Sequence, residues 1–339
     1  MTDLLKELCA ADGTSGDEAA VRQLIISKLT ATDVTYRVDP LGNLLVEKKG
    51  REQAKNRVMF AAHMDEVGFV ARYIDKTGFI KLSAVGGIND DVCFGRRVRF
   101  GNGVRGVIGG KPVHLLRGKD EADKQPKLTD LWCDTGVSTK EDLQVALGDT
   151  AVFDNDAAEF GEHAFCGKAV DDRLGCAILI GLLNSELPYG ITCAFTTQEE
   201  IGTRGATTAA FTLKPDIAVV LETTTACDIP DTKGAEQITR LGEGVVVSFA
   251  DGRTVYDREL YAYTRRLADK LSIPNQTKTK IAGGNDAGVI QESASGVKVI
   301  ALSAPCRYLH TPSCVVNLDD FTATKRLACA LAEELPVYG

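Results

Sequence analysis

The sequence predicts an α/β fold, in which a mainly parallel sheet has helices on both faces and is interrupted by an inserted small β-rich domain. After residue 161, segments with apolar residues at helical spacing alternate with short runs of Val, Ile, Ala and Leu. Such alternation is typical of βα units with a buried parallel sheet. Between residues 69 and 160, short alternating runs are separated by turn signals, and no amphipathic helix of normal length interrupts them. We therefore predict one domain from residues 1–68 and 161–339, with residues 69–160 inserted as a small β-barrel or sandwich.

The first part of the chain is predicted to form two helices followed by strands. Leucine, valine and isoleucine at helical spacing predict two helices within residues 2–31, separated by the breaker Gly13-Thr14-Ser15-Gly16. Strands are expected at residues 35–38, 43–48 and 58–63. In the insertion, strands are expected at residues 69–74, 79–84, 97–100 and 104–109, and a mobile loop rich in Lys, Asp and Glu at residues 118–127.

The remaining elements follow the alternating pattern of the large domain. Helices are expected at residues 172–187, 204–211, 256–271 and 319–335. Strands are expected at residues 191–197, 217–222, 245–249, 276–280 and 297–302.

Composition excludes several classes of protein. The net charge is −8, and no basic stripe is present that would bind nucleic acid. The ten cysteines are scattered without a C-x-x-C pair or a signal peptide, which favours reduced thiols and a cytoplasmic location. No apolar stretch approaches the roughly 20 residues that cross a bilayer, so no membrane partner is expected.

Chelating side chains follow the predicted strands of the large domain. The apolar run at residues 58–62 ends in His63-Met64-Asp65, and similar residues follow other strands or precede a helix. Ligands of open α/β sheets bind at the carboxyl ends of strands, so these side chains are expected at one edge. The set comprises His63, Asp65, Asp171, Asp172, Glu199, Glu200, Glu222 and His310. Imidazole and carboxylate ligands without thiolates suit Zn²⁺, Co²⁺ or Mn²⁺, and carboxylates packed this closely favour a paired-metal site because cations relieve their repulsion.

Each residue also has a structural interpretation. Asp171 or Asp172 is expected to cap the following helix. The pair Glu199 and Glu200 fits a solvated loop, Glu222 fits a strand end that faces water, and His310 before Thr311-Pro312 fits a turn. It is their recurrence at successive strand ends that favours the metal site.

Four motifs resemble the M42 family of metallo-aminopeptidases, which includes glutamyl and tetrahedral aminopeptidases. They are AAHMDEVGF, GKAVDDRLGC, TTQEEIGTRGA and RYLHTP, in the order and spacing of the family. The resemblance covers essentially the whole chain. It implies an exopeptidase with two divalent ions per subunit, and a catalytic domain interrupted by a PDZ-like or barrel-like dimerisation domain. It also implies a homo-oligomer built from dimers, such as the family's dodecamer.

The resemblance assigns roles residue by residue. By motif, Asp171 resembles the carboxylate that bridges the two metals, and Glu199 resembles the general base. His63 and Glu222 resemble the other ligands of one metal, and Glu200 and His310 those of the second. Asp65 resembles the residue that accepts the other N–H of His63 and fixes its tautomer. One departure is Glu222, since many relatives have Asp there, which leaves the geometry at that position open.

Substrate recognition is less defined by the sequence. The family places the loop around Asp286 near the substrate, although Asp286 also fits a cap of the next helix. Arg307 fits either a clamp for an acidic side chain or a structural ion pair. Ser303 and Cys306 lack a nucleophile elbow or a paired histidine, which argues against covalent catalysis. Acidic, hydrophobic and basic N-terminal residues all remain candidates.

The expected function is removal of the N-terminal residue from short peptides. A related metallohydrolase acting as a carboxypeptidase or deacylase, and a silent peptide-binding scaffold, are the alternatives. An endoglucanase would need two carboxylates that flank a sugar without metal. The complete ligand set together with Glu199 favours the peptidase over the scaffold.

Overall fold

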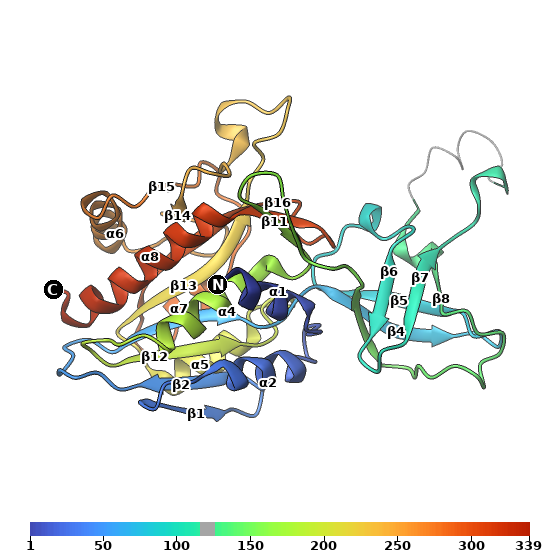
Figure 1. The fold of residues 1–339 in the computed structure, drawn as a ribbon, viewed down its shortest axis with the longest axis horizontal. Coiled ribbons are helices and arrows are strands. Elements are labelled where there is room, and N and C mark those ends of the chain that lie inside the picture. Colours follow the sequence, from blue (N-terminus) through green and yellow to red (C-terminus); the bar gives the residue numbers. More distant parts are fainter. Residues whose placement is uncertain (116–125) are drawn as a thin grey trace.

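The computed structural model describes residues 1–115 and 126–339 of the chain, which form a large α/β part and a smaller β-barrel beside it (Figure 1). The predicted mobile loop at residues 118–127 lies mostly outside the described residues. The barrel lies at one end of the long axis of the molecule, as an extension of the strand that carries His63. The predicted fold class is confirmed.

The two predicted N-terminal helices are present and are separated at the expected breaker. They are α1 (Thr2–Ala10) and α2 (Ala19–Lys28), and each buries the apolar side chains of one face, including Leu5 and Leu8 of α1. Between them, Gly16 has a φ of +92°, which is a conformation that favours glycine.

A large mixed sheet forms the centre of the α/β part. Its main path has the order β1-β2-β12-β3-β13-β16-β17-β11-β10. The strands are β1 (Val34–Val38), β2 (Leu44–Lys48), β3 (Val58–His63), β10 (Ala158–Phe160), β11 (Ala164–Gly167), β12 (Ile191–Thr196), β13 (Ile217–Thr225), β16 (Lys298–Arg307) and β17 (Cys314–Asn317), with β14 (Val245–Val247) and β15 (Asn275–Gln276) attached to β16. The four strands β12, β3, β13 and β16 are parallel, whereas the outer pairs are antiparallel. The carboxyl ends of β3, β12, β13 and β16 therefore meet at one edge.

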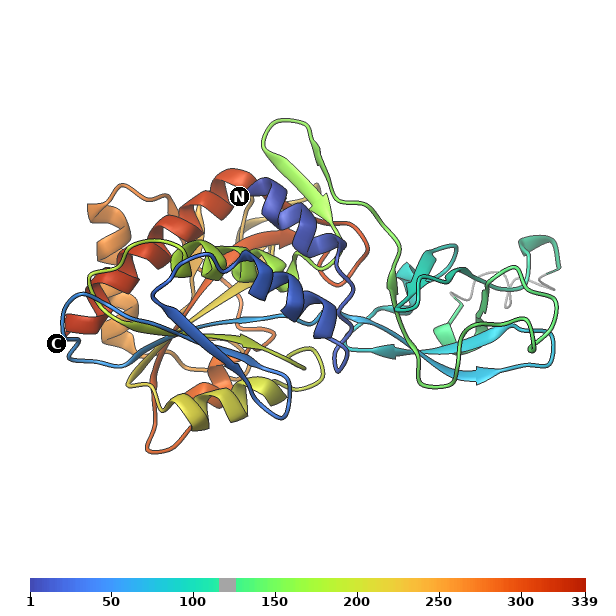
Figure 2. The same cartoon turned by 60° about the horizontal axis from the view of Figure 1, so that its bottom comes forward.

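Helices cover both faces of this sheet (Figure 2). One face packs against α1, α2, α4 (Val170–Leu183), α6 (Arg258–Lys270) and α8 (Leu318–Glu334). The other face packs against α5 (Arg204–Leu213) and α7 (Ala287–Gln291). Alternation along β3 explains the two cores, because Phe60 contributes to the first and Met59 and Ala61 to the second.

The insertion folds as a closed barrel with strand order β4-β5-β8-β7-β6-β9. Its strands are β4 (Gly68–Ile74), β5 (Ile80–Val85), β6 (Arg97–Phe100), β7 (Arg105–Gly109), β8 (Trp132–Asp134) and β9 (Thr150–Phe153). Phe69, Phe100 and Phe153 fill its interior. The hairpin β10–β11 follows the barrel in the chain but belongs to the large sheet, from which it projects (Figure 2).

Several elements differ from the sequence-based prediction. The short strands β8, β9, β10, β11 and β17 were not predicted, and the helix expected after Asp286 is the short helix α7. Of the strand expected at residues 276–280, only Gln276 lies in a strand, as the last residue of β15. The strand β13 continues beyond Glu222 to Thr225, because it pairs with the long strand β16 over its whole length. Short 3-10 helices lie at Asp90–Val92, Val113–Leu115, Leu128–Asp130, Gly234–Gln237 and Leu335–Val337. Among the described residues, no helix is both long and apolar enough to span a membrane.

Candidate metal centre

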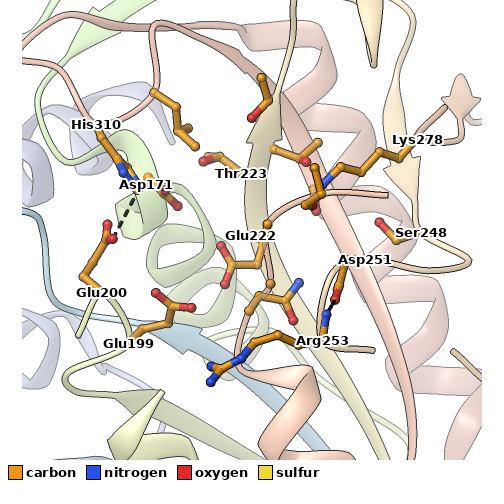
Figure 3. A pocket seen from close by; sticks show the side chains of 18 of the residues that line it. Asp171, Glu199, Glu200, Glu222, Thr223, Ser248, Asp251, Arg253, Lys278 and His310 are labelled. Carbon is orange, nitrogen blue, oxygen red and sulfur yellow. Dashed lines mark hydrogen bonds and ion pairs between the residues drawn. The ribbon is translucent and has the colours of Figure 1, made fainter. Parts of the chain in front are cut away.

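Side chains from four strands or the loops that follow them, and from one helix start, line a cavity of about 440 Å³ at the carboxyl edge of the sheet (Figure 3). His63 ends β3, Glu222 lies within β13, and Asp171 lies at the start of α4. Glu199 and Glu200 follow β12, and His310 follows β16. The structure thus brings together the six residues that the sequence placed at one edge as ligands and base.

The first cluster of ligand atoms comprises His63, Asp171 and Glu222. The Nε2 atom of His63 lies 3.4 Å from Oδ1 of Asp171 and 3.8 Å from Oε2 of Glu222. All three residues are buried, with at most 8% of their surface exposed. Glu222 reaches this cluster even though its side chain is one carbon longer than the Asp expected by resemblance.

The second cluster comprises Asp171, Glu200 and His310. Here Nε2 of His310 lies 3.4 Å from Oδ2 of Asp171 and 3.3 Å from Oε2 of Glu200. Asp171 thus offers Oδ1 to one cluster and Oδ2 to the other. That arrangement is the one required of a carboxylate that bridges two ions.

These separations fit metal ligation better than direct hydrogen bonding. N–H···O hydrogen bonds usually span about 2.7–3.2 Å, and all four N···O distances are longer. Two ligands at about 2.0–2.1 Å from one tetrahedral ion are about 3.3 Å apart. In addition, Oδ1 of Asp171 and Oε1 of Glu222 are buried without a hydrogen-bond partner. Orphaned carboxylate oxygens of this kind suit a cation, so the residues fit the expected group.

Both clusters are rich in carboxylates, and the two imidazoles lower the repulsion among them. Burial raises the pKa of Glu222 well above its ordinary value, and it raises the pKa of Glu200 to about 7 with the help of Asp171. Burial also opposes ionisation of Asp171, but His310 and His63 outweigh it and hold the pKa of Asp171 below its usual range. Conversely, Asp171 and Glu200 raise the pKa of His310 to about 10 against the effect of burial.

Asp65 lies behind the first cluster and organises two segments. Its Oδ1 is 3.5 Å from Nδ1 of His63, while its backbone oxygen is closer to that nitrogen, at 3.1 Å. Its two carboxylate oxygens also accept the backbone N–H groups of Glu199 and Glu200, at 3.0 and 3.1 Å. Ser15 donates a further hydrogen bond of 2.6 Å. The side chain of Asp65 therefore fixes the Glu-Glu turn as well as facing the imidazole.

The two adjacent glutamates have different surroundings. Glu200 belongs to the second cluster, whereas Glu199 belongs to neither cluster but lines the same cavity. Burial raises the pKa of Glu199 well above its ordinary value, and the neighbouring carboxylates add to this effect. A carboxylate that is held off the ligand clusters and binds a proton readily has the properties of a general base.

A buried ion cluster beneath the site was not predicted from the sequence. Lys168 donates to both oxygens of Glu66, at 2.7 and 3.0 Å, and Arg173 contacts Glu66 at 3.2 Å. Arg173 also donates to the backbone oxygens of Met64 and Ala11. The cluster therefore ties the segments that carry His63 and Asp171 to the end of α1. Its signal in the sequence was the pair of basic residues, Lys168 and Arg173, that lie on either side of Asp171-Asp172 in the motif GKAVDDR.

The capping alternatives for the aspartates have different outcomes. Asp172 caps the regular part of α4, because the backbone of α4 is non-helical at Asp171 and Asp172 and Oδ1 of Asp172 accepts the N–H of Gly175 at 2.9 Å. The capping interpretation of Asp286 is wrong. Its Oδ2 accepts a 2.6 Å hydrogen bond from Thr196 instead, and Asn285 accepts the N–H of Ala287.

Neither expected substrate residue is among the described residues that line the cavity. Asp286 is buried below it, with 1% of its surface exposed. Arg307 forms a two-pronged ion pair with Asp228, with both distances 2.7 Å. The contacts of Arg307 are therefore those of a structural ion pair. Other residues that line the cavity are the candidates for binding the substrate side chain.

Comparison with known proteins identifies the family. The profile of the M42 glutamyl aminopeptidase family matches residues 42–327, which include both ligand clusters. The chain belongs to the M42 family of aminopeptidases.

The M42 chain is similar to its relatives over nearly its full length. It is 30% identical to a lysyl aminopeptidase of Pyrococcus furiosus, covering 98% of this chain and 97% of the relative. Among solved structures, an aminopeptidase from the archaeon Desulfurococcus kamchatkensis superposes with a TM-score of 0.92 at 33% identity, covering 98% and 94% of the two chains. The Pyrococcus horikoshii TET1 peptidase, described as assembling into a tetrahedron or a large octahedral shell, gives a TM-score of 0.87 at 32% identity, with 98% and 99% covered.

Proposed function

We propose that this M42 protein is an aminopeptidase that holds two divalent cations, one in each ligand cluster, and hydrolyses the first residue from short peptides. The observation that carries the proposal is the position of Asp171, whose two oxygens face two imidazoles from different strand ends at the same distance of 3.4 Å. The ligand types suit Zn²⁺ or Co²⁺, with Mn²⁺ as a further candidate.

His63 and Glu222 would hold one ion, Glu200 and His310 the other, and Asp171 both. When bound, such ions supply Lewis acidity, which lowers the pKa of water and polarises a carbonyl group. Glu199 accepts the proton of the attacking water and delivers it to the leaving amine, because it lines the cavity and its raised pKa favours holding that proton. Asp65 positions Glu199 through the backbone of the turn, and the backbone oxygen of Asp65, 3.1 Å from Nδ1, orients His63.

The assembly is proposed to be a homo-oligomer built from dimers, up to a dodecamer. Support comes from the TET1 peptidase, which matches 98% of this chain and is described as assembling into a tetrahedron or a large octahedral shell. The barrel stands apart from the sheet and is accordingly the candidate for the dimer contact (Figure 1).

The experiment that tests the function is metal removal and return. Protein treated with a chelator should lose hydrolysis of aminoacyl p-nitroanilides, and added Zn²⁺ or Co²⁺ should restore it. Substrates with an acetylated amino group serve as the control. Hydrolysis of the acetylated substrates alone would favour a deacylase or carboxypeptidase, and activity that survives chelation would contradict the metal mechanism.

A further inference from the structure

The cavity has a second end, away from the two ligand clusters, and this end carries positive charge (Figure 3). Lys278 and Arg253 line it together with Thr223, Ser248 and Asp251. Figure 3 shows the side chain of Lys278 on the side of the cavity away from Glu200 and His310, with its terminal nitrogen pointing toward the middle. The site thus has an acidic side and a basic side.

Lys278 is a buried cation without a carboxylate partner. Only 9% of its surface is exposed, and its Nζ donates one hydrogen bond, of 2.7 Å, to the backbone oxygen of Ala282. Among the residues that the structure describes, no carboxylate lies within ion-pair distance of this nitrogen, although an ammonium group has three protons to donate. Burial accordingly lowers the pKa of Lys278. A buried charge of this kind is unfavourable until a partner neutralises it.

The one acidic side chain at this end does not offer a place for a basic ligand. Oδ1 of Asp251 accepts the backbone N–H groups of Arg253 and Thr254, each at 2.8 Å. Its Oδ2 accepts the hydroxyl of Tyr256 at 2.6 Å. Asp251 is therefore engaged in the wall of the cavity, and Lys278 is the buried cationic donor left for a ligand at this end.

We infer that Lys278 selects substrates whose N-terminal residue has an acidic side chain, by pairing with that carboxylate. The inference rests on the proposed aminopeptidase function and deepens it. The family alone does not decide the question, since a relative with 30% identity is a lysyl aminopeptidase. Arg253, which is exposed and contacts Thr203 through Nη1 at 3.1 Å, adds a second positive charge at the rim.

Two other roles for Lys278 lead to different measurements. A purely structural lysine, which balances Glu222 and its neighbours, would change the turnover of all substrates alike. A lysine that binds the terminal carboxylate of a dipeptide would favour Leu-Leu over Leu-Leu amide. If Lys278 recognises an acidic side chain, the preference for acidic residues is also measured with substrates that have no terminal carboxylate.

The first experiment compares p-nitroanilides of Glu, Gln, Leu and Lys with the metal-loaded wild-type enzyme. Glu and Gln differ in charge but hardly in size, so their kcat/KM ratio isolates the charge. We expect Glu to be preferred over Gln by roughly 10- to 100-fold, as a charge-assisted hydrogen bond would give. A ratio near one, or a preference for Leu or Lys, overturns the inference while leaving the aminopeptidase function intact. Failure to hydrolyse any of the four contradicts the proposed function itself.

The second experiment replaces the charge. Lys278→Met should lower kcat/KM for Glu by roughly 10- to 100-fold, chiefly through KM, and should affect Leu and Gln far less. Lys280→Met is the matched control, because Lys280 is exposed two residues away and does not line the cavity. Equal losses on all four substrates in Lys278→Met would establish the structural role and overturn the inference. If Lys278→Met does not fold, the wild-type ratio of Glu to Gln decides alone.

Discussion

The backbone oxygen of Gly87 lies 2.9 Å from Nδ1 of His310, so a loop of the inserted barrel orients a residue of the second ligand cluster. Gly87 lies between β5 and the 3-10 helix at Asp90–Val92. An acceptor at Nδ1 requires that this nitrogen carry a proton, so Nε2, which faces Asp171 and Glu200, is the nitrogen that can lose its proton and bind an ion. The insertion therefore contributes directly to the geometry of the site.

Gly87→Ala tests this contact. A Cβ atom at this position would lie 3.2 Å from Nδ1 and 3.5 Å from Cε1 of His310, so the ring must shift. We expect the affinity of the second cluster for Zn²⁺ to fall by about 10-fold, because the displaced ring is held less well by the backbone oxygen of residue 87. The measurement is a metal titration of the metal-free protein that resolves two binding events.

The control for this titration is Gly109→Ala, in the barrel strand β7, where an added Cβ meets nothing within 4 Å. It should bind both ions as the wild type does. Equal affinities in Gly87→Ala and Gly109→Ala would show that the barrel loop does not support His310.

Glu199→Gln separates the base from the ligands. The substitution keeps the size of the side chain but removes its ability to accept the proton, so we expect turnover to fall by about 100- to 10,000-fold with metal content unchanged. Metal analysis and kcat measurement on the same preparation check both parts. Near-normal activity would contradict the assignment of Glu199 as the general base.

Glu200→Gln is the contrasting variant at the neighbouring position. Because Glu200 belongs to the second cluster, this variant should lose metal as well as activity. If Glu199→Gln and Glu200→Gln lost equal amounts of metal, the distinction between the two glutamates would be wrong.

Metal binding should release protons and strengthen as the pH rises. In the metal-free protein the pKa of His310 is about 10 and that of Glu200 about 7, so at pH 7 His310 is protonated and Glu200 is partly protonated. Both must lose their protons to bind an ion. Affinity should therefore increase from pH 6 upward and level off only above the pKa of His310. Calorimetry in two buffers of different ionisation enthalpy checks this, and a heat that is independent of the buffer would contradict it.

Glu66→Gln should destabilise the fold strongly. It removes the negative charge from a buried cluster in which Lys168 and Arg173 remain, with 2% and 0% of their surfaces exposed. Breaking a buried ion cluster in this way costs about 3–5 kcal/mol. Urea unfolding of the metal-free protein measures it, with Glu162→Gln on the exposed surface as a control that should change the free energy of unfolding by less than about 0.5 kcal/mol. A loss below about 1 kcal/mol for Glu66→Gln would refute the argument.

The sequence predicts the elements of the large domain well, because their signals are local. The buried strand ending at His63 and the alternation of strands and helices after residue 161 follow from apolar periodicity. Short strands such as β8 and β17, of three and four residues, carry no such signal and form because long-range partners pair with them. The strand expected at residues 276–280 was wrong for the opposite reason, since of those residues only Gln276 pairs with another strand.

The prediction of the site is uneven for a similar reason. Ligand types and strand ends are visible in the sequence, so the residues that form the two clusters were named correctly as neighbours. Contacts between distant segments are not visible. Ser15 reaches Asp65 across 50 positions, and the oxygen of Gly87 reaches His310 across 223. Lys278 follows an unremarkable polar stretch, and only the folded cavity reveals that it is buried without a carboxylate.

Anomalous diffraction from crystals of the zinc-loaded protein would show whether Asp171 joins two cations in one site. We predict two peaks about 3.5–4 Å apart, one beside His63 and Glu222 and the other beside Glu200 and His310, with the carboxylate of Asp171 between them. A single peak, or two peaks of which only one contacts Asp171, would contradict it.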